Sequence, residues 1–408
     1  MDANDRAIAA FTMLGHAAFH TYELVIPLFV TVWLDAFAVT PATLGLIVGA
    51  SYALTGVGAL PSGALSDAYS SKRLVLGCVA GMGAGFALVS VAPNVLGVAA
   101  GLLVWGAAAS VYHPAGLALI SRGARERGTT FAYHGVAGNV GVATGPLLGA
   151  VLLAVLEWRT VAAVLVLPAV LALVVAARLD FDETAGAVAR DADGGREGPR
   201  DLRGFLRDSR LLFTGGFVLV FLVGNLYGLY YRGAFTFLPE VLAGFALFDP
   251  VAVAGRTVEP SQYVYSGLLV LGGAGQYVGG RLVDRVRAEY ALVGTFAALV
   301  VVAALFVPAA DAGLVPLLAA SGLLGFLVFM EAPINQEVIS RHVPAGARGL
   351  SFGYTYLAVF GVGAAGAALA GIVLTRADAG ALFLLLAGVA ALALALGVAL
   401  ARRPDPGA

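Results

Sequence analysis

The sequence predicts an all-α membrane protein that crosses the bilayer twelve times, in two pseudo-symmetric six-helix bundles. The composition is the first indication: the chain of 408 residues is 60% hydrophobic and 12% charged, whereas soluble domains are about 45–50% apolar and about 25% charged. The mean hydropathy of +0.91 agrees. The other indications are long apolar stretches and an internal repeat. The net charge of −1 argues against a nucleic-acid partner.

The apolar stretches give the predicted spans, since a spanning helix needs about 20 mainly apolar residues. The first residues, MDANDR, lead into an apolar run without a small-residue cleavage site, which favours a first spanning helix over a signal peptide. Residues 178–210 are polar and rich in Gly and Asp, so we predict an N-terminal bundle (1–177), a cytoplasmic linker (178–210) and a C-terminal bundle (211–408). The predicted spans are 7–33, 42–62, 74–92, 95–120, 129–154, 159–177, 211–239, 262–279, 291–309, 315–340, 350–375 and 380–401.

The basic residues predict the orientation, because cytoplasmic loops carry an excess of Lys and Arg. If the N-terminus is cytoplasmic, the outer loops hold only Arg159, Arg256 and Arg376, and the basic residues of all other loops and of both termini are inside. We therefore expect both termini in the cytoplasm of a cell-membrane protein.

The two halves of the chain resemble each other in sequence. SGALSD at 62–67 matches GGRLVD at 279–284, which begins 217 residues later. ISR at 120–122 recurs at 339–341, and Arg127-Gly128 matches Arg348-Gly349. Six helices, a linker and six similar helices are the layout of a duplicated transporter.

Three motifs carry a resemblance to a known family. GALSDAYSSKR at 63–73 resembles the loop 2–3 signature of the major facilitator superfamily, and GRLVDRVR at 280–287 is a partial second copy. GNVGVATGPLLG at 138–149 is similar to the fifth-helix motif that is common in exporters of that superfamily. YHPAG at 112–116 resembles the branch of fosmidomycin resistance proteins and related drug exporters.

The resemblance implies a gating role for the loop motif, in which the family's aspartate locks loop 2–3 against the opposite half. The residues concerned are Gly63, Asp67, Arg73, Gly280, Asp284 and Arg285. By its chemistry, Gly63 would allow close backbone approach, and Asp67 would accept hydrogen bonds at a helix N-terminus. The alternative is an ordinary solvated loop.

The fifth-helix motif predicts a smooth helix face and a bend. Its small residues leave room for a neighbouring helix, and Pro146 cannot donate to the carbonyl of Val142. Tight packing explains this pattern as well as a role in export direction does. The motif residues are Gly138, Gly141, Gly145, Pro146 and Gly149.

Three titratable residues share one face of the first helix. His16, His20 and Glu23 follow the helical spacing i, i+4 and i+7, and Pro27 leaves the carbonyl of Glu23 without its helical donor. Proton coupling is the favoured interpretation, because buried carboxyl and imidazole groups can titrate near physiological pH. Hydrogen bonding between helices and a metal site are the alternatives. The spacing is not HExxH and no further cluster is evident in the sequence, so we expect no metal.

Other polar residues inside predicted spans are functional candidates, since charged groups at mid-bilayer cost about 2.5–3.5 kcal/mol. Glu331 and His113 join the proton-coupling group; Pro333 is expected to break the helix beside Glu331. Glu337 is expected to pair with Arg341 at i+4. The candidates for the substrate cavity are Arg232, Tyr231, Asn139, His134 and Asn335.

These observations predict a secondary active transporter that works by alternating access. The favoured activity is proton-coupled export, by antiport, of a small amphipathic or anionic compound, with Glu23 as the main protonation site. Uptake by symport of a nutrient or organic anion is the alternative, and an intramembrane metalloenzyme is a remote one. We expect a monomer in the lipid bilayer whose partners are a small-molecule substrate and protons, with no cofactor and no enzymatic activity.

Overall fold

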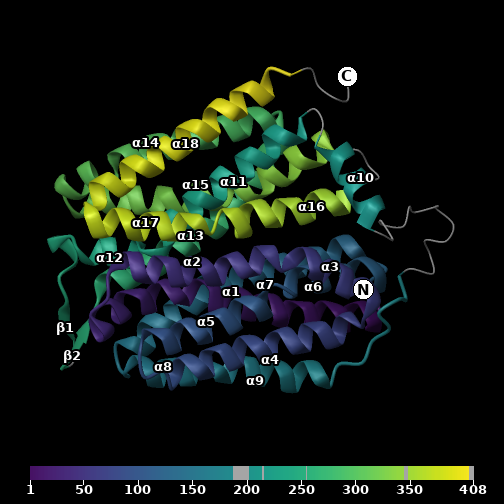
Figure 1. Ribbon diagram of the computed structural model, residues 1–408, viewed down its shortest axis with the longest axis horizontal. Helices are drawn as coiled ribbons and strands as arrows, with labels where there is room; N and C mark the ends of the chain where they lie inside the picture. Colours follow the sequence, from purple (N-terminus) through teal and green to yellow (C-terminus); the bar gives the residue numbers. More distant parts are fainter. Residues whose placement is uncertain (187–201, 214–215, 254, 344–347, 404–408) are drawn as a thin grey trace. The chain divides into compact units, whose positions relative to one another are not determined.

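The computed structural model describes residues 1–186, 202–213, 216–253, 255–343 and 348–403, and most of them are helical (Figure 1). The chain divides into two compact units. Unit 1 comprises residues 1–39, 50–195 and 250–262, and unit 2 comprises residues 40–49, 196–249 and 263–408. Each unit therefore contains one short segment from the other half of the sequence.

Unit 1 is a helical bundle. Its helices α1 and α7 pack along each other, as do α4 and α5, and α9 lies against α4. The helix α2 (Pro41–Val57) passes from unit 2 into unit 1 at residue 50. The remaining helices are α1 (Ala3–Phe37), α3 (Ala59–Ala68), α4 (Ser71–Ser90), α5 (Val95–Ala109), α6 (Tyr112–Gly123), α7 (Arg127–Leu153), α8 (Trp158–Val164) and α9 (Val166–Ala177).

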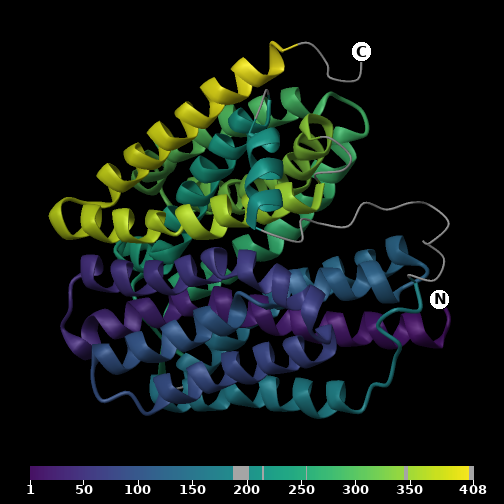
Figure 2. The same cartoon turned by 45° about the vertical axis from the view of Figure 1, so that its right-hand side comes forward.

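Unit 2 is also a bundle, in which α14 packs against both α15 and α18, and α11 packs against α17 and α18 (Figure 2). Its elements are α10 (Leu202–Leu212), α11 (Phe217–Thr236), α12 (Leu238–Ala243), the short 3-10 helix η1 (Ala246–Phe248), α13 (Pro260–Val283), α14 (Ala288–Asp311), α15 (Leu314–His342), α16 (Arg348–Tyr356), the π-helix η3 (Leu357–Val362), α17 (Ala365–Arg376) and α18 (Ala379–Ala401). The first residues of α13 belong to unit 1.

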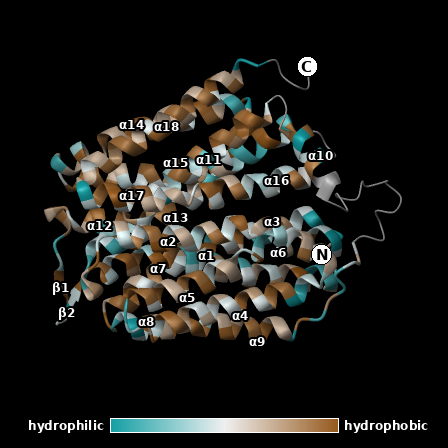
Figure 3. Cartoon of the chain, in the orientation of Figure 1, coloured by the Kyte–Doolittle hydropathy of each residue, from teal (hydrophilic) through white to brown (hydrophobic). Residues whose placement is uncertain are grey.

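Eleven helical segments in the described part of the chain are long and apolar enough to cross a membrane. They match eleven of the twelve predicted spans. The predicted eighth span, 262–279, is also helical as α13, but it is not among the eleven. Its sequence contains Gln262, Gln276 and several glycines, which lower its hydropathy. Figure 3 shows hydrophobic residues along helices such as α9 and α18, as expected for surfaces that face lipid.

Several predicted spans are interrupted, and one predicted break is absent. The second span is divided into α2 and α3 at Gly58, the fourth into α5 and α6, and the sixth into α8 and α9. The prediction that Pro333 breaks its helix is wrong, because α15 continues through it to His342. Prolines are tolerated in spanning helices where neighbouring groups satisfy the freed carbonyl. The helix α10 begins inside the predicted linker.

Side chains cap the helix starts that the sequence places after polar residues. Asp2 accepts a hydrogen bond from the Asp5 amide at the start of α1, and Asn94 does the same for Gly97 at the start of α5. Asp378 caps α18 by accepting from the Ala381 amide. Such caps satisfy amide groups that lack a partner within the first turn.

Glycines allow close helix contacts in both units. In unit 1, a Cβ added at Gly145 of α7 would lie 2.6 Å from the Cα of Thr21 on α1. In unit 2, a Cβ added at Gly366 of α17 would lie 2.8 Å from the amide nitrogen of Gly233 on α11. The number of residues between Gly145 and Gly366 in the sequence equals the number between the repeated residues Arg127 and Arg348. The internal repeat thus extends to this packing contact.

A β-hairpin lies in the segment between α12 and α13. Strand β1 (Val251–Val253) pairs antiparallel with β2 (Arg256–Val258), and Val251 lies opposite Val258. This hairpin belongs to unit 1, where the Arg256 guanidinium donates to the carbonyl of Val155 at 2.9 Å.

Candidate functional site

The titratable residues of α1 form a hydrogen-bonded row, as their helical spacing predicts. The Nδ1 atom of His20 lies 2.7 Å from Oε2 of Glu23. The Nε2 atoms of His20 and His16 are 3.1 Å apart. The Nδ1 atom of His16 lies 2.7 Å from the carbonyl oxygen of His134 on α7. The row therefore runs from a carboxylate through two imidazoles to a backbone carbonyl.

Two further histidines adjoin this row. His113, in the first turn of α6, offers a ring nitrogen that forms a group with nitrogens of His16 and His20, all within 4.8 Å of one another. The His134 ring stacks on that of His16 with centroids 3.8 Å apart. The sequence alone did not bring the third histidine to this group, because His113 lies on α6, 93 residues beyond His20; the expectation that no metal is bound stays a prediction. We name His16, His20 and His113 the histidine triad.

Two tyrosines that the sequence analysis missed support this region. The Tyr52 hydroxyl donates to the Glu23 carbonyl at 3.0 Å; this is the acceptor that Pro27 leaves without its helical donor. The Tyr112 ring stacks on His16, with centroids 5.6 Å apart, and its hydroxyl donates to the Thr12 carbonyl. The proline pattern predicts a spare acceptor, but it does not identify the donor.

The fifth-helix motif shapes the same region. A Cβ added at Gly138 would lie 2.6 Å from Nδ1 of His16, so the absence of a side chain makes room for the imidazole. The backbone of α1 occupies the space beside Gly141 and Gly145. Gly149 faces Val25, and Pro146 is buried within a continuous α7. Asn139, which directly follows Gly138 in α7, is half-buried.

Unit 2 contains a buried acid on α15. Glu331 is 0% exposed, and neither of its carboxyl oxygens has a hydrogen-bond partner among the described residues. Asn335, one helical turn further on, is buried as well, and its Oδ1 atom also lacks a partner in the described structure. By contrast, Glu337 accepts a hydrogen bond from Nε of Arg341 at 2.8 Å, as the i+4 spacing predicts.

Arg232 of α11 is 3% exposed, so its side chain is buried in unit 2. Its guanidinium lies 4.8 Å from the ring centroid of Tyr231 and 5.3 Å from that of Phe360. Cation–π contacts of this kind stabilise a desolvated positive charge. Tyr231 is buried too, so these two candidates place charge and aromatic surface inside unit 2.

The loop 2–3 motif differs in detail from the chemistry expected for it. A Cβ added at Gly63 or at Gly280 would meet nothing within 4 Å, so close backbone approach does not explain these glycines. Asp67 lies near the C-terminal end of α3, not at a helix N-terminus, and its side chain is outside the described structure. Arg73, Asp284 and Arg285 are exposed.

Glu183 supplies the carboxylate at the start of α4 instead. Its Oε1 accepts from the Ser70 hydroxyl at 2.5 Å, and its Oε2 accepts from the Ser71 amide at 2.7 Å. Arg122 donates to the Ser66 carbonyl at 2.6 Å and to the Ser71 hydroxyl at 2.8 Å. The predicted linker therefore begins with a segment that holds the loop 2–3 region, a contact over more than 100 residues that local spacing does not reveal.

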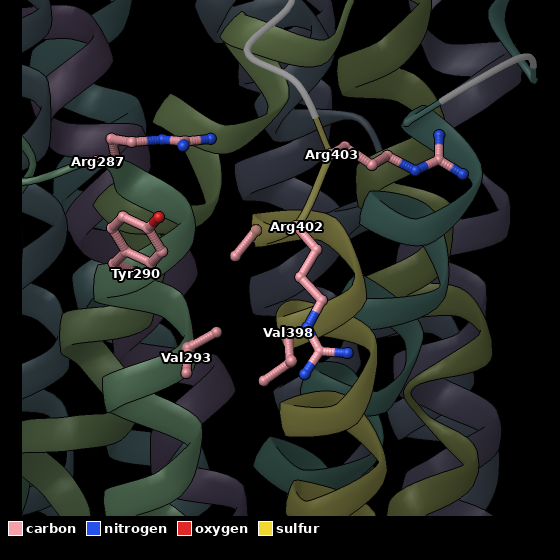
Figure 4. Close-up of a pocket in the computed structure, with 7 residues that line it drawn as sticks. Arg287, Tyr290, Val293, Val398, Arg402 and Arg403 are labelled. Atoms are coloured by element: carbon pink, nitrogen blue, oxygen red, sulfur yellow. The ribbon is translucent and has the colours of Figure 1, made fainter.

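A separate pocket of about 550 Å³ lies between the ends of α14 and α18 in unit 2 (Figure 4). Arg287, Arg402 and Arg403 line it together with Tyr290, and Val293 and Val398 form its apolar wall. Its positive charge and apolar wall differ from the histidine triad of unit 1 in both chemistry and location.

Comparison with known protein families gives a match that spans nearly the whole chain. A family model described as Major Facilitator Superfamily matches residues 10–367 and 262–408. A search among curated proteins gave no match.

Solved structures share the fold over their full length. A bacterial homologue of the human lysosomal transporter Spinster, in an inward-facing and occupied conformation, has a TM-score of 0.75 at 13% identity, with 98% of each chain covered. A mutant of the nucleoside transporter NupG has a TM-score of 0.77 at 13% identity, covering 97% of this chain and 99% of NupG. The inward-open xylose transporter XylE from E. coli gives 0.74 at 14% identity, covering 97% and 96%.

Proposed function

Because the chain belongs to the major facilitator superfamily, we propose that this multi-pass membrane protein is a secondary active transporter driven by protons. It would move a small molecule by alternating access. The family and its transporter neighbours point to a non-enzymatic transporter, which argues against the intramembrane metalloenzyme considered from sequence.

The environment of Glu331 carries the proposal of proton coupling. An ionised carboxylate buried without donor or counterion costs several kcal/mol. Glu331 is fully enclosed and neither oxygen has a hydrogen-bond partner in the described residues, so the enclosed acid holds its proton. In a conformation that admits water, the carboxylate would be solvated and the proton released. A proton that binds in one conformation and leaves in another couples the proton gradient to the conformational cycle.

The contacts of Glu23 and Glu331 change the order expected from sequence. Glu23 already has a hydrogen-bonding partner, because its Oε2 lies 2.7 Å from Nδ1 of His20, whereas Glu331 has none among the described residues. We therefore assign proton coupling first to Glu331. A coupling role for Glu23, His20, His16 and His113 stays a prediction.

The position of Arg232 supports the proposal that the substrate carries an anionic group. It places a positive charge inside unit 2, against the rings of Tyr231 and Phe360. Buried arginines bind carboxylates and phosphates well because their donors form a fixed fork. Asn335, His134 and Asn139 stay predictions as cavity residues. We propose export as the direction, supported only by the fifth-helix motif, and uptake by symport is the alternative.

The proton proposal has a test that needs no known substrate. Infrared difference spectra between acidic and alkaline conditions should contain the carbonyl band of a protonated carboxyl group, which disappears in Glu331→Gln. Glu337→Gln is the matched control, because Glu337 lies on the same helix but pairs with Arg341. A second test requires a transported substrate: in liposomes, Glu331→Gln should lose transport driven by a pH gradient and keep exchange of substrate at equal pH. An unchanged band and unchanged driven transport would refute the assignment.

Direction is tested in cells that lack their own drug pumps. Expression of an exporter raises tolerance to its substrate, whereas expression of a symporter supports growth on a scarce solute. The assay requires a panel of anionic and amphipathic compounds.

A further inference from the structure

We propose that unit 1 binds one divalent transition-metal ion of borderline softness, such as Zn²⁺, through the histidine triad. The ligand atoms are ring nitrogens of His16, His20 and His113, which come within 4.8 Å of one another. Two ligands lie one turn apart on α1 and the third lies on α6. This proposal is separate from proton coupling at Glu331, which lies in unit 2.

The hydrogen bonds of His16 and His20 turn their Nε2 atoms toward each other. The carbonyl of His134 can only accept, so the Nδ1 of His16, 2.7 Å away, carries the hydrogen, and in the neutral ring its Nε2 is an acceptor. The Nδ1 of His20 lies 2.7 Å from Oε2 of Glu23, and the two Nε2 atoms are 3.1 Å apart. When the Nδ1 of His20 donates to the Glu23 carboxylate, both Nε2 atoms present lone pairs, and a positive ion between them offsets their repulsion.

The spacing of His16 and His20 suits a metal ion. With Zn–N bonds of about 2.0–2.1 Å and tetrahedral angles, two ligand nitrogens lie about 3.3 Å apart, close to the 3.1 Å observed. A single shared proton would join only His16 and His20 and would not use His113. Imidazole ligands suit Zn, Cu, Fe and Ni, and three protein ligands leave a fourth position for water or another donor.

The surroundings supply the second shell that metal-bound histidines need. Such ligands usually donate their other ring N–H to a carboxylate or a backbone carbonyl, and Glu23 and the His134 carbonyl provide one of each. His16 is also held between the rings of His134 and Tyr112 and fits the space that Gly138 leaves. Because the ligands come from α1 and α6, the bound ion would hold these two helices at one separation.

Metal binding is measured on the full-length protein in detergent, purified with an affinity tag that contains no histidine. After treatment with a chelator, the protein is titrated with Zn²⁺ and, separately, with Co²⁺. Binding of one Zn²⁺ per chain is expected, and Co²⁺ should produce the intense visible absorption of a four-coordinate nitrogen site.

Asparagine substitutions test the ligands individually. An asparagine amide can replace the Nδ1 donor of histidine but not its Nε2 ligand, so His16→Asn keeps the bond to the His134 carbonyl. His16→Asn, His20→Asn and His113→Asn should each weaken Zn²⁺ binding at least 100-fold, and Glu23→Gln should weaken it 10–100-fold. His342→Asn is the matched control, since this histidine lies in unit 2 outside the triad; it should leave binding unchanged.

A second variant guards against misfolding of the histidine substitutions. Gly138→Ala places a methyl group against the His16 ring and should weaken Zn²⁺ binding at least tenfold without removing any ligand. The proposal is overturned if the stripped protein binds no stoichiometric metal, if binding survives in His113→Asn, or if His342→Asn abolishes it. Metal binding that persists in Glu331→Gln separates this site from the proton proposal.

Discussion

Gly145→Ala should destabilise the protein by opening the contact between α1 and α7. The added Cβ would lie 2.6 Å from the Cα of Thr21 and 3.0 Å from its carbonyl oxygen, whereas ordinary contacts begin at 3.4 Å. The two backbones must therefore separate by about 0.8 Å, since no rotation of a side chain can relieve a clash with main-chain atoms. The bulk at residue 145 also crowds the ring of Pro146, which disfavours helical geometry in the preceding residue.

The expected magnitude follows from two opposing terms. Replacing Gly by Ala in a helix favours folding by about 0.8–1 kcal/mol, and overpacking opposes it by about 1–3 kcal/mol. Gly135→Ala isolates the first term, because a Cβ at Gly135 of the same helix would meet nothing within 4 Å. The free energy of unfolding should thus be about 1–3 kcal/mol lower for Gly145→Ala than for Gly135→Ala.

Unfolding of the two variants in a mild detergent, with increasing sodium dodecyl sulfate, measures this difference. Zn²⁺ titration of the same samples reports whether α1 moves, because α1 carries two residues of the histidine triad. Equal stabilisation in both variants would refute the close α1–α7 contact and the explanation of the fifth-helix motif that depends on it.

Two further predictions concern the ends of the helices. Glu183→Ala removes the carboxylate from the start of α4. The loss should lower the free energy of unfolding by about 1 kcal/mol and speed amide exchange at Ser71 and Lys72. Asp180→Asn is the control and should not speed this exchange, because Asp180 is exposed; equal exchange rates in both variants would contradict the role of Glu183. Burial and then the charge of Asp35 raise the pKa of Glu259, which directly follows strand β2, above 4.5. The contribution of Glu259 to hairpin docking is therefore present below pH 4.5 and is lost as the pH rises through the raised pKa. Glu259→Gln should therefore slow amide exchange of residues 251–258 relative to the natural chain at pH 7 but not at pH 4, and a difference of equal size at both would refute the sign.

The sequence predicted the spanning helices well because apolar length is a local property. Counting the Lys and Arg residues in each loop predicts the orientation of the chain in the membrane in a similarly simple way. The breaks at Gly58 and near Ser110 were missed, since glycine and serine occur throughout these spans. At Pro333 we predicted a helix break that is absent, because a membrane helix can continue through a proline.

The candidate site was predicted only where its residues share one helix. The row of His16, His20 and Glu23 follows from a spacing of 3.6 residues per turn. The convergence of His113 and the donation from Tyr52 depend on how separate helices pack, which no local pattern in α1 reveals. Glu183 was missed for the same reason: its partners precede it by more than 100 residues.

The paired glycines Gly145 and Gly366 bear on how the protein evolved. A duplicated gene begins with two identical copies, so a feature present in both halves was inherited from the single ancestral bundle. The close helix contact is such a feature. The histidines of α1 are not, since α11 contains tyrosines and Arg232 and no histidine. The two halves therefore share this close helix packing, whereas the polar residues of α1 and α11 differ.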